Sequence, residues 1–335
     1  MTKAPKRHPF VSTMLQELAH EVGVEILVEP EFGYAGQIRC PNGKLHYFRK
    51  THFDLNPLGA TEIAKDKDYT TFFLKKLGYP VIAGQKYYSE DHCRIIGSKR
   101  DIHAGARYAE RHFPVIVKPN SRSLGMAVSA VHSAEEYYQA AADAFDKDRV
   151  ILVQKIVTGK DYRLVVLDDE VLSAYERLPL TVVGQEGRTI QALLFEKQSA
   201  FRKAGRDTEL NLEDPRMLRR LARLGMALDT VLEPKFRVVL LDNANLSSGG
   251  ESVDVTSDIH PGYKAIAVGL TRDMGLRYAG IDLMVQGDIS KKPGRYTVIE
   301  INASPGIDNY AAGGERHMEV VANLYRKVLE AIRDL

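Results

Sequence analysis

The chain contains 335 residues, which is enough for two or three structural units with a sizeable core. Its charged fraction of 27% and net charge of +2 are ordinary for a globular protein, and no block of Lys and Arg indicates a nucleic-acid surface. The chain has only two cysteines, which excludes a disulfide framework and a cysteine zinc cage. No apolar run is long enough to span a bilayer, and the N-terminal residues do not have the apolar stretch of a secretory signal. The cytoplasm is therefore the expected location.

Residues 1–66 are expected to form a short N-terminal α/β unit. An amphipathic helix over 10–21 precedes a strand at 24–28, and two further strand-like runs flank Asn42-Gly43, which is a strong hairpin signal. A unit of about sixty residues is expected to be too small to work alone. Its shortness suggests that a partner subunit completes the pocket.

Residues 67–157 are expected to form a second unit. A helix begins near Lys67 and stops where Gly and Pro follow its last apolar turn. A buried strand then ends with Lys118, and a loop of small residues at 121–127 follows it. The strand at 151–157 closes this unit.

Residues 158–335 are expected to form the third unit. An antiparallel meander is followed by a polar surface excursion over 185–215, with a helix near 190–195, and later by a helix over 262–274. Two strands and a terminal helix complete the chain. No internal repeat or low-complexity linker separates these pieces.

The strongest chemical signal lies in the two strands near the end of the chain. The apolar run 279–285 holds one acid, Asp282, and the alternating run 295–306 places Glu300 and Asn302 on one face. If these strands pair, the three side chains form a patch of oxygen ligands of the kind that holds hard cations with phosphate substrates. The alternative is a strand whose polar face meets water. An acid in one run and Glu-x-Asn in the other favour the metal site.

Lysines could supply positive charge along the phosphates of a nucleoside triphosphate. The candidates are Lys67, Lys118 and Lys155. Lys118 precedes the loop 121–127, whose backbone N–H groups could hold phosphate; the alternative is a strand-end lysine that extends into water. Neither G-x-x-x-x-G-K-[ST] nor G-x-G-x-x-G occurs, so neither a P-loop nor a dinucleotide fold is supported.

Six segments, taken in order, resemble those of an ATP-grasp ligase. They are IAKDKDYTTFFLKKLGYPV, PVIVKPNSRSLG, QKIVTGKDYRLVV, ANLSSGGESVDVT, AGIDLMV and VIEINASPG, which together cover roughly residues 60–310. The resemblance is strongest to the ATP-grasp part of cyanophycin synthetase and of the bifunctional glutathione synthetases. Since the Mur-ligase-like half and the long N-terminal part of cyanophycin synthetase are missing, the chain is expected to be a stand-alone member.

The resemblance implies an α+β ATP-grasp fold. Two α/β subdomains with antiparallel sheets would grip ATP, with 67–157 as the small lid subdomain and 158–335 as the C-terminal subdomain. The N-terminal unit 1–66 would precede them. The cofactors implied are ATP and Mg²⁺, or Mn²⁺ in its place.

The resemblance also implies roles for individual residues. Gln154 stands where relatives more often have a glutamate. In the loop after Lys118, relatives often carry two glycines where this chain has Gly125 followed by Met126, so this loop is expected to close more stiffly. For Asp161, the alternative to a ribose contact is a turn aspartate. The implied metal ligands are Asp282, Glu300 and Asn302; the implied ATP contacts are Lys67, Lys118, Ser123, Gly125 and Asn245 for the phosphates, Gln154, Lys155 and Val157 for the adenine, and Asp161 for the ribose.

Such enzymes are understood to transfer the γ-phosphate of ATP to a carboxylate, giving an acyl phosphate that an amine attacks. The chain is therefore expected to be a carboxylate–amine ligase that forms a peptide or amide bond and releases ADP and phosphate. Bringing two anions together requires cations, and Arg163 and Arg177 are the candidates; the alternative is that both are ordinary exposed arginines. The rival functions are a small-molecule kinase and a non-catalytic nucleotide-binding module.

Expected partners are an amino acid or short peptide as substrate and a second copy of the chain as a homodimer. Neither nucleic acid nor a membrane is expected. The histidines are scattered and predict no zinc site.

Overall fold

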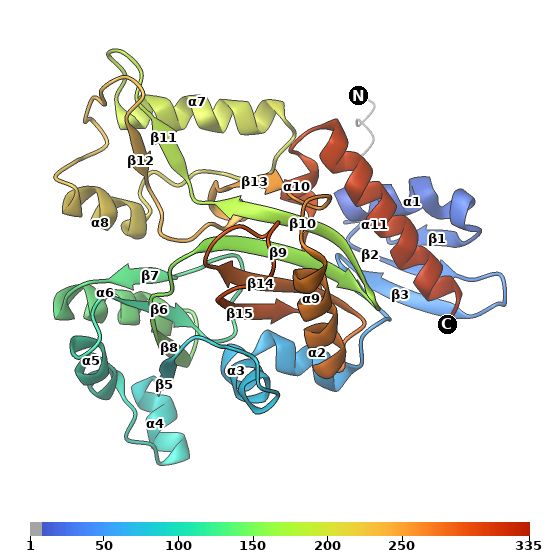
Figure 1. Ribbon diagram of the computed structural model, residues 1–335, viewed down its shortest axis with the longest axis horizontal. Coiled ribbons are helices and arrows are strands. Elements are labelled where there is room, and N and C mark those ends of the chain that lie inside the picture. Colours follow the sequence, from blue (N-terminus) through green and yellow to red (C-terminus); the bar gives the residue numbers. More distant parts are fainter. Residues whose placement is uncertain (1–8) are drawn as a thin grey trace.

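The computed structural model describes residues 9–335 (Figure 1). Across these residues the strands form three antiparallel sheets and one two-stranded ribbon. Figure 1 shows the central sheet flanked by the N-terminal sheet with the C-terminal helix on one side and by a second sheet on the other. No helix of the described part of the chain is long and apolar enough to cross a membrane.

The N-terminal unit packs one helix on a small sheet. Gly23 ends this helix with φ +78°, a left-handed conformation that glycine adopts at no steric cost. The predicted hairpin is confirmed, because Gly43 has φ +83° and the strands on either side of it pair. The elements are α1 (Phe10–Val22), β1 (Glu25–Val28), β2 (Ala35–Arg39), β3 (Leu45–Arg49) and β4 (His52–Phe53), with the strands in the order β1-β2-β3-β4.

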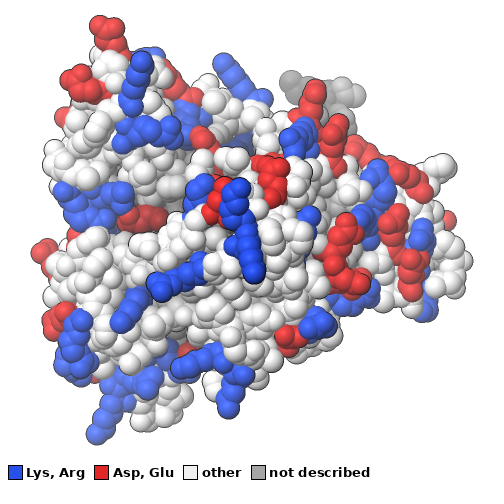
Figure 2. Space-filling model, viewed as in Figure 1, with Lys and Arg blue, Asp and Glu red and all other residues white. Residues whose placement is uncertain are grey.

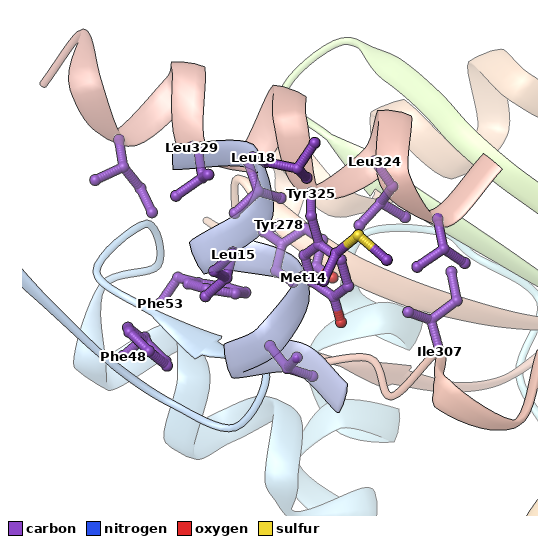
Figure 3. Close-up of a cluster of buried hydrophobic side chains, with 14 of the residues drawn as sticks. Met14, Leu15, Leu18, Phe48, Phe53, Tyr278, Ile307, Leu324, Tyr325 and Leu329 are labelled. Atoms are coloured by element: carbon purple, nitrogen blue, oxygen red, sulfur yellow. The ribbon is translucent and has the colours of Figure 1, made fainter. Parts of the chain in front are cut away.

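This unit shares its hydrophobic core with the C-terminal helix α11 (Glu315–Arg333). Figure 3 shows Leu15 and Leu18 of α1 lying close to Tyr325 and Leu329 of α11. The cluster also takes in aromatic side chains of the N-terminal sheet and of the central sheet. The N-terminal unit therefore shares one core with α11 and the central sheet.

The second sheet carries helices on one face. Its strands lie in the order β5-β8-β6-β7, and Val115, Val117, Ile151 and Val153 pack with the helices in one core. Because side chains alternate along a strand, Lys118 faces the opposite side. The elements are β5 (Gly84–Tyr88), α4 (Glu90–Ile96), α5 (Ile102–Glu110), β6 (Val115–Pro119), β7 (Ser129–Val131), α6 (Ala134–Phe145) and β8 (Val150–Lys155).

The helices α2 (Leu58–Lys65) and α3 (Lys67–Lys76) pack on the central sheet. Asp66 caps α3 by accepting a hydrogen bond from Tyr69 N, and Leu74 lies in the core of the central sheet. The predicted lid subdomain includes α3, and this helix contacts both units: Leu74 packs in the core of the central sheet, while Lys67 and Asp68 bond to residues just after β6.

The central sheet lies in the order β13-β10-β9-β14-β15. One face is covered by α9 and forms a core of its own, whereas Val165 and Leu167 on the other face pack with α11. That second face is thus apolar at the end that packs with α11, and polar residues occupy its other end. The elements are β9 (Lys160–Leu167), β10 (Glu170–Leu178), η1 (Leu246–Ser248), β13 (Glu251–Asp254), α9 (Pro261–Asp273), β14 (Tyr278–Val285), β15 (Tyr296–Asn302) and α10 (Asp308–Ala311).

Residues 179–243 leave the central sheet and form a compact excursion, which we call the insert. It has a separate core that includes Leu193 and Leu221. The predicted helix near 190–195 continues to Lys203, because Phe201 extends its buried side. The elements are β11 (Thr181–Val183), α7 (Ile190–Lys203), α8 (Pro215–Arg223) and β12 (Arg237–Val239).

Candidate functional site

Charged side chains occupy the polar end of the central sheet. The strands pair so that Arg163 lies opposite Asp282, and Asp282 lies opposite Glu300. Side chains two residues apart share a face, so Asp161 and Asn302 belong to the same surface. The strands that carry Asp282 and Glu300 therefore pair, which is the condition for the predicted patch of oxygen ligands.

Asp282 is the buried centre of this surface, with its side chain 2% exposed. Arg163 donates to both of its oxygens, with Nη2 2.9 Å from Oδ2, and Arg177 Nη2 also lies 2.9 Å from Oδ2. Gly280 leaves space for this group, because a Cβ there would lie 3.2 Å from Arg163 Cδ. A buried carboxylate is stable only when it is paired. The alternative of two exposed arginines is wrong.

Arg177 also binds a second acid, Asp161. The two residues are opposite each other across β9 and β10, and Arg177 Nη2 lies 2.7 Å from Asp161 Oδ1. Burial raises the pKa of Asp161 and nearby Asp282 raises it further, although Arg177 acts in the opposite direction. One oxygen of the predicted ribose ligand is thus bonded to an arginine.

Glu300 is surrounded by positive charge. Burial would raise its pKa, but Lys67, Lys118 and Arg163, with a hydrogen bond from Asn302, lower the pKa to about 2. Asn302 Nδ2 donates to Glu300 Oε1 at 3.0 Å, and Lys67 Nζ lies 3.7 Å from Oε2. The carboxylate is therefore ionised throughout the neutral pH range.

Lys118 reaches this cluster from the second sheet and is 6% exposed. Burial lowers the pKa of Lys118 to about 8, and Lys67 contributes to this, while Glu300 and Asp282 oppose it. Lowered pKa values of this kind favour a functional role for a buried lysine. The alternative of a lysine that extends into water is wrong.

Lys67 and Asn120 join α3 to the end of β6. Lys67 Nζ donates to the carbonyl of Arg122 at 2.6 Å. Asn120 Nδ2 donates to Asp66 Oδ2 at 2.6 Å, and its Oδ1 accepts from Asp68 N at 2.9 Å. Asn120 is buried and was missed by the sequence analysis, although an Asn directly after a strand-ending Pro is a usable signal.

The loop at 121–127 adopts left-handed backbone conformations. Leu124, Gly125 and Ala127 have φ values of 61°, 68° and 52°. A Cβ at Gly125 would collide with the side-chain amide of Asn243 in the insert, so this position requires glycine. Ser123 in the same loop is exposed.

Asn245 lies beside the same loop. A Cβ at Gly125 would be 3.3 Å from Asn245 Nδ2, and Asn245 Oδ1 accepts from Ser247 N to begin η1. Ser247 Oγ in turn donates to the carbonyl of Leu124 at 3.3 Å. The predicted phosphate-proximal asparagine therefore contacts the predicted phosphate loop.

Gln154 shares the face of the second sheet that carries Lys118. It is buried, and its Oε1 is an acceptor without a hydrogen-bond partner among the residues described. An unpaired buried acceptor is costly, so a ligand that donates a hydrogen bond would be favoured here. Lys155 is exposed, with its backbone N bonded to the carbonyl of Ala83, and Val157 is half-buried beyond the end of β8.

The oxygen donors of the charged surface are of the kind that hard cations prefer. Within residues 9–335 no group of three or more His, Cys, Asp or Glu side chains could hold a metal ion. The predicted ligands, Asp282, Glu300 and the amide of Asn302, comprise two acids and one amide, whose oxygens fit a hard cation in kind. Such a cation would compete with Arg163 and Arg177 for the oxygens of Asp282.

Two family models match separate parts of the chain. The model described as D-ala D-ala ligase C-terminus matches residues 73–185, and the model described as RimK-like ATP-grasp domain matches residues 235–332. The segment between them falls within the insert. Together they cover both the second sheet and the strands that carry Asp282 and Glu300.

Curated relatives of much greater length also match. The chain is 31% identical over 264 residues to a cyanophycin synthetase from Crocosphaera subtropica, covering 76% of this chain and 29% of that protein. It is 34% identical over 204 residues to a glutathione biosynthesis bifunctional protein from Mannheimia succiniciproducens, covering 57% of this chain and 27% of that protein. The chain thus spans under a third of each of these relatives.

A solved structure shows a related fold. The bifunctional glutathione synthetase from Pasteurella multocida superposes with a TM-score of 0.59 at 22% sequence identity, over 97% of this chain and 45% of that one. At this identity the likeness speaks for the fold alone.

We predict that Asp282→Asn destabilises the protein by about 3 kcal/mol, because it removes the buried negative charge that Arg163 and Arg177 share and leaves Arg177 with Asp161 alone. Chemical denaturation followed by circular dichroism measures the change. Asp168→Asn is the matched control, since Asp168 binds Arg277 in an ion pair that is more than one-third exposed and should contribute less than about 1 kcal/mol. Equal effects of the two substitutions would contradict the prediction.

Proposed function

This chain belongs to the ATP-grasp proteins, and we propose that it is an ATP-dependent ligase that joins a carboxylate to an amine. The observation that carries the proposal is the convergence of two lysines and two arginines on the acids of one sheet surface. Transfer of phosphate between anions depends mainly on positioning and on stabilisation of charge. Buried cations around fixed carboxylates are suited to that task.

ATP would lie between the second sheet and the central sheet. Lys67 and Lys118 would bind its phosphates from the two sides, together with the backbone of the loop 121–127, where Ser123 and Gly125 lie, and with Asn245. The unpaired Oε1 of Gln154 supports this placement of the base, because it could accept from the adenine amino group. Lys155 and Val157 would flank the base, and the second oxygen of Asp161 would be available to the ribose.

Asp282, Glu300 and Asn302 would hold Mg²⁺, or Mn²⁺ in its place. Such an ion neutralises phosphate charge when it is bound. The low pKa of Glu300 supports this assignment, since the ligand is ionised without any proton being displaced.

Arg163 and Arg177 would bind the carboxylate substrate. Each arginine already forms an ion pair with the carboxylate of Asp282, and the carboxylate of a substrate would be a partner of the same chemical kind. The carboxylate oxygen attacks the γ-phosphorus of ATP and ADP leaves. The amine then attacks the acyl carbon, phosphate leaves with the carboxyl oxygen, and the departing phosphate takes up the proton that the amine loses. The arginines hold the carboxylate substrate beside the γ-phosphate of ATP, and their positive charge lowers the repulsion between these two anions.

The acyl phosphate must be kept from water. The loop 121–127 contacts η1 and the insert, so the site is covered from the side of the second sheet. We propose that residues 67–157 form the lid, 158–335 the substrate unit and 1–66 a supporting unit, with α3 at the boundary because it packs on the central sheet through Leu74 and bonds to Asn120 of the lid.

The substrates proposed are an amino acid or a short peptide, with ADP and phosphate as products. The names of the relatives, cyanophycin synthetase and glutathione biosynthesis bifunctional protein, support this class. A cytoplasmic enzyme that forms a homodimer is the corresponding proposal for location and assembly.

The decisive experiment is a screen for phosphate release from ATP with paired amino acids and short peptides. Release that requires both a carboxylate and an amine, together with a hydroxamate formed when hydroxylamine replaces the amine, supports the ligase. Transfer to a hydroxyl without a need for an amine would instead identify a kinase.

Glu300→Gln should abolish turnover and leave the fold intact, because it removes one charge of the ion site but keeps the shape. Turnover is measured by phosphate release, and folding by thermal denaturation. The matched substitution Glu62→Gln changes an exposed acid paired with Lys65 and should leave turnover unchanged. Normal activity of Glu300→Gln would remove the metal assignment.

ATP binding should weaken as pH rises through about 8, because Lys118 then loses the proton that gives it charge. Lys118 carries its positive charge at pH values below its lowered pKa and loses this charge above it. The KM for ATP, measured between pH 7 and pH 9.5, should therefore rise. Lys118→Arg should remove the rise, since guanidinium does not titrate in this range.

Lys147→Arg, at an exposed lysine paired with Asp146, serves as the control and should keep the wild-type pH dependence. If Lys118→Arg and the wild type gave the same profile, Lys118 would not be the group responsible.

A further inference from the structure

The insert extends from the central sheet to the second sheet. At its base, Arg206 Nη2 donates to the carbonyl of Gly250 at 2.7 Å. At its far side, α8 lies next to β7 and α6 (Figure 1). Basic side chains gather at this boundary, with acidic ones beside them (Figure 2). The insert therefore bridges the two units that are proposed to enclose ATP.

Three arginines on one side of α8 make the contacts with the second sheet. They are spaced three and four residues apart, which places them on one face of the helix, while Met217 and Leu221 pack into the core of the insert. Their contacts are Arg216 Nη1 to Gly125 O at 2.5 Å, Arg219 Nη2 to Ser129 Oγ at 3.3 Å, Arg219 Nη1 to Asp143 Oδ2 at 3.6 Å, Arg223 Nη1 to Ala130 O at 3.3 Å and Arg223 Nη1 to Glu136 Oε2 at 3.1 Å.

Arg216 is fixed before it reaches the loop. Asp214, the N-cap of α8, accepts from Arg216 Nε at 2.9 Å and from Nη2 at 2.6 Å. Burial would raise the pKa of Asp214, but the bonds from Arg216 lower it, so the pair stays charged. This leaves Nη1 to bind the carbonyl of Gly125. The loop is thus held by a side chain that has little freedom to move away.

Asn243 lies against the same glycine. Its side-chain Nδ2 is buried and is a donor without a partner among the residues described. A Cβ at Gly125 would occupy its place, so the amide touches the loop directly. A buried unpaired donor is costly and needs an acceptor. A phosphate oxygen held by this loop would be such an acceptor.

We propose that the insert completes the nucleotide site: Arg216 is a positioning residue that holds the loop 121–127 over the phosphates, and Asn243 donates a hydrogen bond to a phosphate oxygen. This inference rests on the proposed function. It adds that a segment outside both sheets sets the affinity for ATP. Neither residue was a candidate in the sequence analysis.

The first test uses the protein without nucleotide, so it does not depend on the ligase activity. Arg216→Ala should raise the rate of amide hydrogen exchange in residues 121–128 by about tenfold, the effect of losing one hydrogen bond to a charged group. Arg220→Ala is the matched control, because Arg220 on the same helix makes its side-chain hydrogen bonds, among the residues that the structure describes, to Val239 and Asp242 within the insert. It should leave exchange in the loop unchanged.

The second test separates nucleotide binding from turnover. Arg216→Ala and Asn243→Ala should each raise the KM for ATP by about tenfold, with kcat and the KM for the carboxylate within about twofold of the wild type. Arg216→Lys should recover part of the affinity, because an ammonium can still donate to Gly125. Arg220→Ala should keep the wild-type KM for ATP.

The outcomes distinguish the two proposals. Unchanged exchange in Arg216→Ala would overturn the positioning role, and an unchanged KM for ATP in Asn243→Ala would overturn the phosphate contact, while the ligase proposal stands. Failure of the wild-type protein to bind ATP would overturn the proposed function itself. Equal loss in Arg216→Ala and Arg220→Ala would also overturn the positioning role, because a general effect on the insert would then account for both.

Discussion

The burial of Asp282 is the constraint on which the site depends. A carboxylate taken out of water must be paired, and two arginines on neighbouring strands meet this requirement. Their positive charge then demands further acids, which Asp161 supplies. The result is a charged surface in which every member is held by its neighbours. Such a surface is organised before any substrate arrives, and this reduces the reorganisation that phosphoryl transfer requires.

The two faces of the central sheet explain where this surface can exist. One face is largely apolar beneath α9 and α3, and the opposite face is apolar only where α11 and the N-terminal unit cover it. The N-terminal unit therefore does more than precede the other two units. By covering half of a face with Leu15, Phe53 and their neighbours, it confines the polar residues to the remaining end.

The second sheet and the insert approach this end from two directions. Lys118 faces it from the second sheet, and Lys67 and Asn120 bind α3 to the strand that carries Lys118. The insert then contacts the loop after that strand through α8. Lys67 links the loop to the charged surface, because its Nζ donates to the carbonyl of Arg122 and also lies 3.7 Å from Glu300 Oε2.

The sequence alone determined the elements whose signals are local: the hairpin at Asn42-Gly43, the alternating strand with Glu300 and Asn302, and the family to which the six segments belong. It gave no signal for β5 and β13, because both are edge strands with little apolar alternation. Only the tertiary structure decided that Arg163 and Arg177 are buried against Asp282, that α3 packs on the central sheet, and that Arg216 and Asn243 reach Gly125. These contacts join residues far apart in the chain, and strand register and helix packing, not local propensity, bring them together.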